Sequence, residues 1–203
     1  GTKGLSCILV EKDTPGFSVG KIEDKMGIHG SETAELIFDD CRVPKENLIG
    51  KEGQGFKIAM TALDGARIGV AAQALGIAQR ALDESVKYMK ERIQFGKPIA
   101  ALQGLQWYIS DMATKIECAK WMVFRAAWLK VDGQPYTKEA AIAKLNASET
   151  ANFVVNKALQ IHGGYGYMKD YPLERMYRDA KITEIYEGTS EVHKLVISRS
   201  VLK

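Results

Sequence analysis

The sequence predicts a mainly α protein, in which a C-terminal antiparallel four-helix bundle is preceded by part of a β domain. Three observations predict this fold. Residues 1–45 alternate apolar and polar side chains between turn residues, as β-strands do. From about residue 55, apolar side chains recur every three or four residues, as in amphipathic helices. Short breaks rich in glycine and proline divide this second region, which is typical of antiparallel helices joined by short loops.

The first region predicts roughly three strands, in "LSCILVEK", "FSVGKI" and "TAELIFDDCRVP". So few strands do not form a stable sheet with two good faces. We therefore divide the chain into a partial β domain, residues 1–48, and a helical bundle domain, residues 49–203. The opening "GTKGLSCILVEKD" also resembles sequence from within a domain, as expected of a chain that lacks its natural beginning.

The second region predicts three long helices followed by two short ones. The first long helix runs to about Gln94, where "FGKP" stops it. The second runs from about Ala101 to Lys130. The third begins near Thr137, an expected N-cap, and ends at "HGGYG". Shorter helices are expected around residues 172–180 and 189–202.

Composition excludes several classes of function. The formal net charge is only +3 with acids and bases interspersed, which argues against nucleic acid as a partner. No run of about 18 apolar residues occurs, so no membrane span is expected. The three cysteines are far apart and lack C-x-x-C spacing, which indicates free thiols in a reducing compartment. The three histidines lack metal-ligand spacing, so no metal site is predicted.

Several polar motifs have both a structural and a functional interpretation. Asp64 and Arg67 are one helical turn apart, which predicts an ion pair, although such a pair would also suit a polar ligand entering the bundle. Arg92 and Gln103 flank the first helix break. Spacing favours Arg92 as a complement to a helix C-terminus over an anion-binding pair. Spacing likewise favours the glycines of "QIHGGYGY" as a helix cap over a phosphate-binding backbone.

Two further features are interpreted in the same way. Glu187 in "TEIYEGTSEVHK" is either an acid in the first turn of a helix, which is favourable electrostatics, or a carboxylate placed to take a proton. Its position alone favours the first interpretation. The aromatic side chains of Trp107, Trp121, Phe124 and Trp128 recur at helical spacing, which favours core or an inter-helix seam over a cofactor site.

Four stretches together change these interpretations. In chain order they are "KMGIHGSETAELIFDDCRVP", "LDGARIGVAAQALGIAQRAL", "ERIQFGKPIAALQGLQ", and "QIHGGYGY" followed by "YPLERMYRDAKITEIYEGTSE". Along essentially the whole chain they resemble the acyl-CoA dehydrogenase family, most closely its short-chain and short/branched-chain members. The resemblance implies an N-terminally truncated subunit, formed by the later part of the middle β domain and the C-terminal bundle. The absent part carries the family's loops around the isoalloxazine ring.

The resemblance implies an FAD-dependent α,β-dehydrogenation of an acyl-CoA thioester to a trans-2-enoyl-CoA. Glu187 matches the family's catalytic base, which removes the α-proton. In the family, the backbone N–H of the base and a ribityl hydroxyl of FAD bind the thioester carbonyl, whose developing charge needs stabilisation. Some members carry the base on the long helix instead. The matching position here is Ala66, which cannot supply a carboxylate.

The resemblance also implies ligand contacts. Residues matching the substrate site are Asp64, Gly65, Ala66, Arg67 and Gly188. Residues matching FAD contacts are Arg92, Phe95, Gln103, Gln160, Ile161, His162, Gly163, Gly164, Thr189, Ser190 and Glu191. Among these, Arg92 matches a residue on the pyrophosphate of a neighbouring subunit's FAD, so the resemblance reverses the interpretation of Arg92 and of the glycines. Sites built across subunits imply a homotetramer, and the implied redox partner is an electron-transfer flavoprotein.

Two alternatives stay open from the sequence. The same family chemistry could run as an enoyl-CoA reductase, because direction depends on the redox partner. The chain could also be a truncated, non-catalytic helical assembly module, because it lacks the half-site for the flavin ring. The expected compartment is the bacterial cytoplasm or the mitochondrial matrix.

Overall fold

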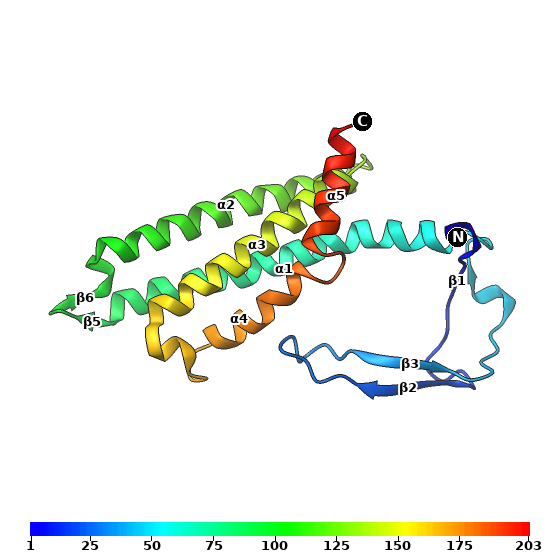
Figure 1. Cartoon of the computed structure of the whole chain (residues 1–203), viewed down its shortest axis with the longest axis horizontal. Coiled ribbons are helices and arrows are strands. Elements are labelled where there is room, and N and C mark those ends of the chain that lie inside the picture. The colour runs from blue at the N-terminus through cyan, green and yellow to red at the C-terminus, as the bar shows by residue number, and fades with distance from the viewer. The chain divides into compact units, whose positions relative to one another are not determined.

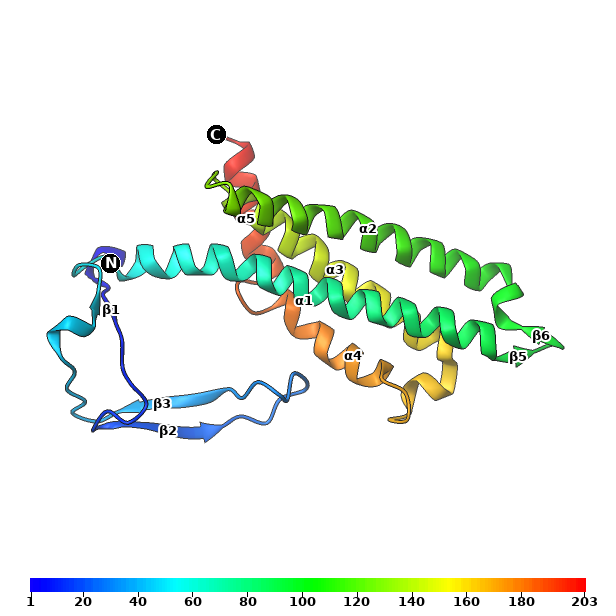
Figure 2. The same cartoon turned by 180° about the vertical axis from the view of Figure 1, so that it is seen from behind.

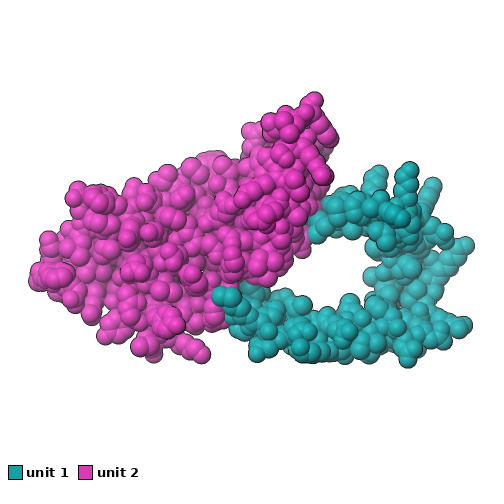
Figure 3. Space-filling view, viewed as in Figure 1, with its two compact units in different colours: residues 1–63 teal, residues 64–203 magenta.

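The structure is a computed structural model that describes all 203 residues. It contains two compact units, Gly1–Leu63 and Asp64–Lys203, which are coloured separately in Figure 3. The predicted mainly α fold with strands at the beginning is confirmed. The expected domain boundary between residues 48 and 49 stays a prediction. The division into two compact units is a different one and falls after Leu63, within helix α1 (Gly55–Glu91).

Unit 1 contains four short strands. Strand β1 (Cys7–Ile8) pairs antiparallel with β4 (Leu48–Ile49), and β2 (Phe17–Ile22) pairs antiparallel with β3 (Ala34–Phe38). The second pair places Phe17 opposite Phe38, with ring centroids 5.2 Å apart. Apolar side chains stay exposed on both strands, including Val19 at 52% and Leu36 at 56%. These strands therefore bury little apolar surface by themselves, as expected of an incomplete sheet.

The helices of the chain follow the predicted order. They are α1 (Gly55–Glu91), α2 (Gln103–Val131), α3 (Thr137–His162), α4 (Leu173–Lys181) and α5 (Ser190–Val201). Within unit 2, α3 contacts α2, α4 and α5. Figures 1 and 2 both show α2, α3 and the later part of α1 side by side. None of these helices combines the length and the apolar character that a membrane crossing requires.

The end of α1 differs from the prediction. The helix ends at Glu91 rather than near Gln94, and a small hairpin follows, in which β5 (Ile93–Gln94) pairs with β6 (Lys97–Pro98). At its tip, Phe95 and Gly96 have φ values of +53° and +77°. Two successive positive φ values are the signature of a type I′ turn, whose twist matches that of the paired strands. The helix break is therefore an ordered hairpin.

The start of α3 differs in a smaller way. Thr137 is the first residue of α3 and not its N-cap, a position that Tyr136 occupies without a side-chain cap. The hydroxyl of Thr137 instead donates a hydrogen bond to Oδ2 of Asp64 at 2.7 Å. The expectation of a threonine cap was wrong because a long-range acceptor on α1 is available to the hydroxyl.

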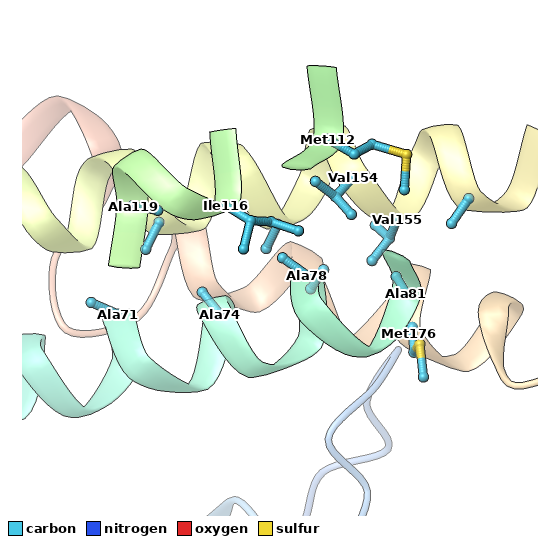
Figure 4. Packing of buried hydrophobic residues seen from close by; sticks show 14 of the residues in the cluster. Ala71, Ala74, Ala78, Ala81, Met112, Ile116, Ala119, Val154, Val155 and Met176 are labelled. Carbon is cyan, nitrogen blue, oxygen red and sulfur yellow. The ribbon is translucent and has the colours of Figure 1, made fainter. Parts of the chain in front are cut away.

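Small side chains dominate the core of unit 2. Ala71, Ala74, Ala78 and Ala81 recur on α1 at three- and four-residue spacing, and each is fully buried. Figure 4 shows these alanines on the side of α1 that faces α2 and α3. The core of α3 is similar, with Ala140, Ala143, Ala147, Ala151 and Ala158 all fully buried. Small residues let helix backbones approach closely, and the larger Met112, Ile116, Val154 and Val155 fill the space that remains.

The aromatic residues of α2 are not part of this core. Trp107, Trp121, Phe124 and Trp128 are 51–62% exposed. The interpretation of these residues as core was therefore wrong for this chain. They form an apolar outer face of α2 that no other part of the chain covers. The alternative interpretation, a seam between helices, would therefore require helices from another copy of the chain.

We expect Ala78→Leu to destabilise the protein by about 1–3 kcal/mol, because the larger leucine side chain overpacks a fully buried position between helices. Ala72→Leu is the control, since Ala72 is exposed on the same helix. The free energy of unfolding, from denaturant titration, checks this prediction. Equal effects of the two substitutions would show that close packing at Ala78 does not limit stability.

Candidate functional site

The connection between α4 and α5 holds Glu187 in an unusual backbone conformation. Glu187 and Gly188 have φ values of +56° and +102°. Positive φ costs a residue with a side chain about 1–2 kcal/mol, so the surroundings of Glu187 must maintain it. Helix α5 begins only at Ser190, with Thr189 as its N-cap. The interpretation of Glu187 as an acid in the first turn of a helix was therefore wrong, and Glu191 occupies that role.

The carboxylate of Glu187 is incompletely satisfied. Its Oε2 atom is buried and has no hydrogen-bond partner in the chain. Buried carboxylate oxygens normally accept hydrogen bonds, because desolvation without one is costly. An unpartnered, buried oxygen is instead suited to receive a proton from a bound molecule.

The main chain of this loop is held from one side. Nε of Arg67 on α1 donates to the carbonyl oxygen of Glu187 at 3.4 Å, and Nζ of Lys144 on α3 donates to that of Gly188 at 2.6 Å. The N–H groups of Glu187 and Gly188 make no hydrogen bond within the chain. Two successive carbonyls are thus fixed by cations while two successive N–H groups stay open to an acceptor on a ligand.

Asp64 and Arg67 form the predicted ion pair, in which Arg67 Nη1 lies 2.6 Å from Asp64 Oδ1. The side chain of Arg67 is 8% exposed and that of Asp64 is 19% exposed. Thr137 donates to the other oxygen of Asp64. The pair therefore connects α1, α3 and the Glu187 loop. Gly65 and Ala66 lie between its members, and a Cβ atom on Gly65 would come within 2.9 Å of Nζ of Lys130.

Two buried residues beside the loop were missed in the sequence. Lys144 and His193 are both fully buried. Burial lowers the pKa of Lys144 to about 8. Burial, together with the positive charges of Lys144 and Arg67, lowers the pKa of His193 to about 4. One signal was available, since Lys144 lies within the apolar, alanine-rich "AAIAKLNA", and lysine is almost never fully buried unless it is paired.

The depressed pKa of His193 predicts acid sensitivity. Below about pH 6.5 the unfolded chain protonates this histidine, whereas the folded chain resists until about pH 4. Stability should therefore fall as pH decreases through this window, by roughly 2–4 kcal/mol from this group. His193→Gln should remove that share of the loss, which unfolding free energies at pH 7 and pH 4.5 would measure.

His29→Gln serves as the matched control, because His29 is exposed. If His193→Gln showed the same acid loss as the unsubstituted protein, the buried imidazole would not be the group responsible.

A second site lies where α1 ends and α3 meets the following turn. A cavity of about 560 Å³ opens there. Its lining includes six residues that the resemblance placed on FAD: Arg92, Phe95, Ile161, His162, Gly163 and Gly164. Gln103 and Gln160 are exposed and do not line it. The structure thus brings most, but not all, of this predicted group together.

The cavity combines one cation with aromatic walls. The guanidinium of Arg92 lies 5.4 Å from the ring centre of Tyr165, and the ring of His162 stacks on that of Tyr88 at 4.2 Å. Burial lowers the pKa of His162, and its Nδ1 contacts the carbonyl oxygen of Ala158 at 2.8 Å. Nδ1 of the neutral ring therefore carries the proton, and the buried, unpartnered Nε2 is an acceptor. An aromatic, anionic ligand with a donor group fits this lining.

The glycines of this cavity serve two purposes. Gly163 has a φ of +59° and caps α3, so the interpretation of the diglycine as a helix cap is confirmed. Gly163 and Gly164 also line the cavity, and a Cβ atom on either would meet nothing within 4 Å. The bare backbone therefore leaves room for a ligand.

The two regions are far apart within one chain. Residues 67 and 92 are separated by most of α1, about 37 Å at the helical rise of about 1.5 Å per residue. Thr189, Ser190 and Glu191 come two to four residues after Glu187, so they belong with the first region. The predicted FAD contacts therefore form two separate groups within one chain.

The family of the chain follows from its whole length. The family model described as "Acyl-CoA dehydrogenase, C-terminal domain" matches residues 53–202, and the one described as "Acyl-CoA dehydrogenase, middle domain" matches residues 1–41. The chain belongs to the acyl-CoA dehydrogenase family. The resemblance predicted from the motifs is confirmed.

Several relatives match over the entire chain. An "Acryloyl-CoA reductase (NADH)" of Anaerotignum propionicum is 74% identical over 100% of this chain and 52% of its own length. A short-chain-specific acyl-CoA dehydrogenase of Clostridium acetobutylicum is 60% identical over 100% of this chain and 54% of its own length. The chain thus spans about half the length of the curated relatives it matches.

Solved structures agree with this placement. The butyryl-CoA dehydrogenase of Megasphaera elsdenii superposes with a TM-score of 0.99 at 54% identity, covering 100% of this chain and 53% of that one. A chain from the structure described as "Electron transferring flavoprotein of Acidaminococcus fermentans: Towards a mechanism of flavin-based electron bifurcation" gives a TM-score of 0.99 at 61% identity. It covers 100% of this chain and 53% of that chain.

Proposed function

We propose that a subunit of the relatives' full length carrying this chain catalyses the flavin-dependent α,β-dehydrogenation of a short- or branched-chain acyl-CoA to a trans-2-enoyl-CoA. The observation that carries the proposal is the buried, unpartnered Oε2 of Glu187. Family membership supports the reaction, and relatives named short-chain-specific and butyryl-CoA dehydrogenases support the substrate class.

In this proposal Glu187 takes the α-proton of the acyl group. The open N–H groups of Glu187 and Gly188 offer donors for the thioester carbonyl oxygen, on which negative charge develops as the proton leaves. The nearby Arg67 cation adds favourable electrostatics. Bound FAD would supply the acceptor for the hydride that leaves the β-carbon.

FAD binding is proposed for the residues that fit it. The Arg92 guanidinium suits a pyrophosphate, the aromatic walls suit an adenine ring, and the glycine backbone leaves room for both. Thr189, Ser190 and Glu191 would lie beside the flavin near Glu187. Because these groups are separated by most of α1, we propose that FAD is shared between copies of the chain.

The proposed assembly is a homotetramer, a dimer of dimers. Sharing FAD requires at least a second copy, which would supply the group of contacts that one chain places out of reach. The exposed apolar face of α2 supports further association, because large apolar patches usually become covered. Trp121 and Phe124 already pack edge to face on it, with ring centroids 6.0 Å apart.

The reductase direction is a second candidate, favoured by the 74% identical relative named as an acryloyl-CoA reductase. In that direction Glu187 would return a proton to the α-carbon of an enoyl-CoA. An electron-transfer flavoprotein is the proposed redox partner in either direction. The match to a chain in a structure described as an electron transferring flavoprotein supports this partner.

The proposed compartment is the bacterial cytoplasm or the mitochondrial matrix. Relatives of both kinds occur, including a rat protein named as mitochondrial at 56% identity. Cys7, Cys41 and Cys118 are free thiols, which supports a reducing compartment.

We expect Glu187→Gln to lower turnover of butyryl-CoA by roughly 10²–10⁴-fold, because the amide cannot accept the α-proton. Flavin content and melting temperature should stay unchanged. Glu149→Gln is the control. The side chain of Glu149 is 52% exposed, and its ion pair with Lys194 is a long one at 3.9 Å, so the substitution should have little effect. Near-native turnover by the Glu187 variant would refute its role as base. A flavin-loaded, inactive unsubstituted protein would favour the non-catalytic alternative.

We expect Arg92→Met to weaken FAD binding by about 10–100-fold, the effect of losing a charge-assisted contact. The ratio of flavin to protein after dilution and desalting measures this change. Arg80→Met is the control, because Arg80 lies on α1, twelve residues before Arg92, and its side chain is 64% exposed. Unchanged flavin retention in the Arg92 variant would remove the pyrophosphate assignment.

A further inference from the structure

Lys144 is the most unusual charged residue of the chain. Its side chain is fully buried, yet no carboxylate lies within ion-pairing distance. Its one hydrogen bond goes to the carbonyl oxygen of Gly188, at 2.6 Å. Burying an ammonium group that has a single main-chain partner is costly. Such a cost is retained where the contact serves a purpose that an apolar side chain would not.

The contact falls at the most constrained point of the loop. Glu187 and Gly188 both have positive φ, and the carbonyl next to that of Gly188 along the chain is held by Arg67. The two cations come from different helices, α1 and α3, whose packing fixes the distance between them. The loop therefore takes its conformation from the bundle core.

His193 limits the loop from another direction. A Cβ atom on Gly188 would lie 3.2 Å from Nε2 and 3.3 Å from Cε1 of His193, so the imidazole packs directly against this glycine. Neither ring nitrogen makes a hydrogen bond of normal geometry, although a weak contact with the Gly188 backbone acts to raise the pKa of the ring against the effect of burial. The ring therefore limits the space beside Gly188, while Lys144 makes the short, directional hydrogen bond to its carbonyl.

We propose that Lys144 is a positioning residue: by holding the Gly188 carbonyl it keeps the N–H groups of the Glu187 loop aimed at the thioester carbonyl of a bound acyl-CoA. The inference rests on the proposed function and adds a residue that touches neither substrate nor cofactor. Without the ammonium group, the peptide plane that joins the Gly188 carbonyl to the Thr189 N–H could rotate toward water, and the adjoining backbone of Glu187 and Gly188 would move with it. The open N–H groups would then lose their alignment, and misalignment of a few tenths of an ångström weakens such donors.

The test compares two ligands that differ only where a carbonyl group in one is a methylene group in the other. Acetyl-CoA has the thioester carbonyl but no β-carbon, so it cannot be dehydrogenated. S-ethyl-CoA is its thioether counterpart. Their dissociation constants are measured by calorimetry with the full-length, flavin-loaded subunit. Lys144→Met should weaken acetyl-CoA binding about tenfold and leave S-ethyl-CoA binding within about twofold, since only the first ligand uses the carbonyl contact.

Lys138→Met is the matched control. Lys138 lies in the first turn of the same helix and pairs with Glu139 at the surface, 3.2 Å away. It should change neither dissociation constant. Equal weakening of both ligands by Lys144→Met would reduce Lys144 to a general structural role, and no weakening of either would remove it from the site. Both results overturn the inference.

A second measurement covers the case in which Lys144→Met does not fold. The pKa of Lys144 is lowered to about 8, so its charge should be lost between pH 7 and pH 9.5. In the unsubstituted protein, the preference for acetyl-CoA over S-ethyl-CoA should fall across this range, because a charge-assisted hydrogen bond weakens. The charged and titratable groups around Lys144 are Glu184, Glu187 and Glu191, with Arg67 and His193. A constant preference would overturn the inference.

The two proposals fail separately. Turnover of butyryl-CoA by the unsubstituted subunit tests the proposed function, and the ligand comparison tests Lys144. If the subunit turns over butyryl-CoA but its preference for acetyl-CoA over S-ethyl-CoA does not depend on Lys144, the proposed function stands and the role of Lys144 is refuted. If the subunit does not turn over butyryl-CoA, the proposed function is refuted, whatever the result for Lys144.

Discussion

The close packing of three helices through fully buried alanines is the constraint on which the rest of unit 2 depends. Because these side chains are small, α1, α2 and α3 approach closely enough for polar groups on different helices to meet. Asp64 on α1 reaches Thr137 on α3, and Arg67 and Lys144 reach the same loop from two helices. A bundle packed through larger side chains would separate these groups, so the site inherits its geometry from the core.

Helical periodicity predicted the number and order of the helices because apolar spacing reports directly which face is buried. The predicted helix ends were wrong where the chain formed a local turn or a long-range hydrogen bond that apolar spacing does not report. The hairpin at Phe95 and Gly96 depends on positive φ values that composition only hints at, and the hydroxyl of Thr137 found an acceptor 73 residues away in sequence. The exposed aromatic face of α2 has the spacing of a core, and spacing cannot tell a core from a subunit contact.

The candidate site was predictable in part. Glu187 could be identified as a catalytic candidate only through its family motif, since its position next to a helix favoured an ordinary electrostatic role. The residues that hold the loop were not identified, because Lys144 and His193 are distant in sequence and meet at Gly188 only in three dimensions. Their burial carries the information, and burial of an individual polar side chain is the property that sequence patterns report least well.

The length of α1 has a consequence for mixed assemblies. If one copy supplies Glu187 and another supplies Arg92 to each flavin, a subunit defective in the first residue and a subunit defective in the second are both inactive alone. Paired with each other, they form one site carrying both defects and one carrying neither. Two inactive variants expressed together would then regain part of the activity, because half of the sites in such a mixed dimer are intact. The dimer would therefore be the smallest assembly that can carry out the reaction.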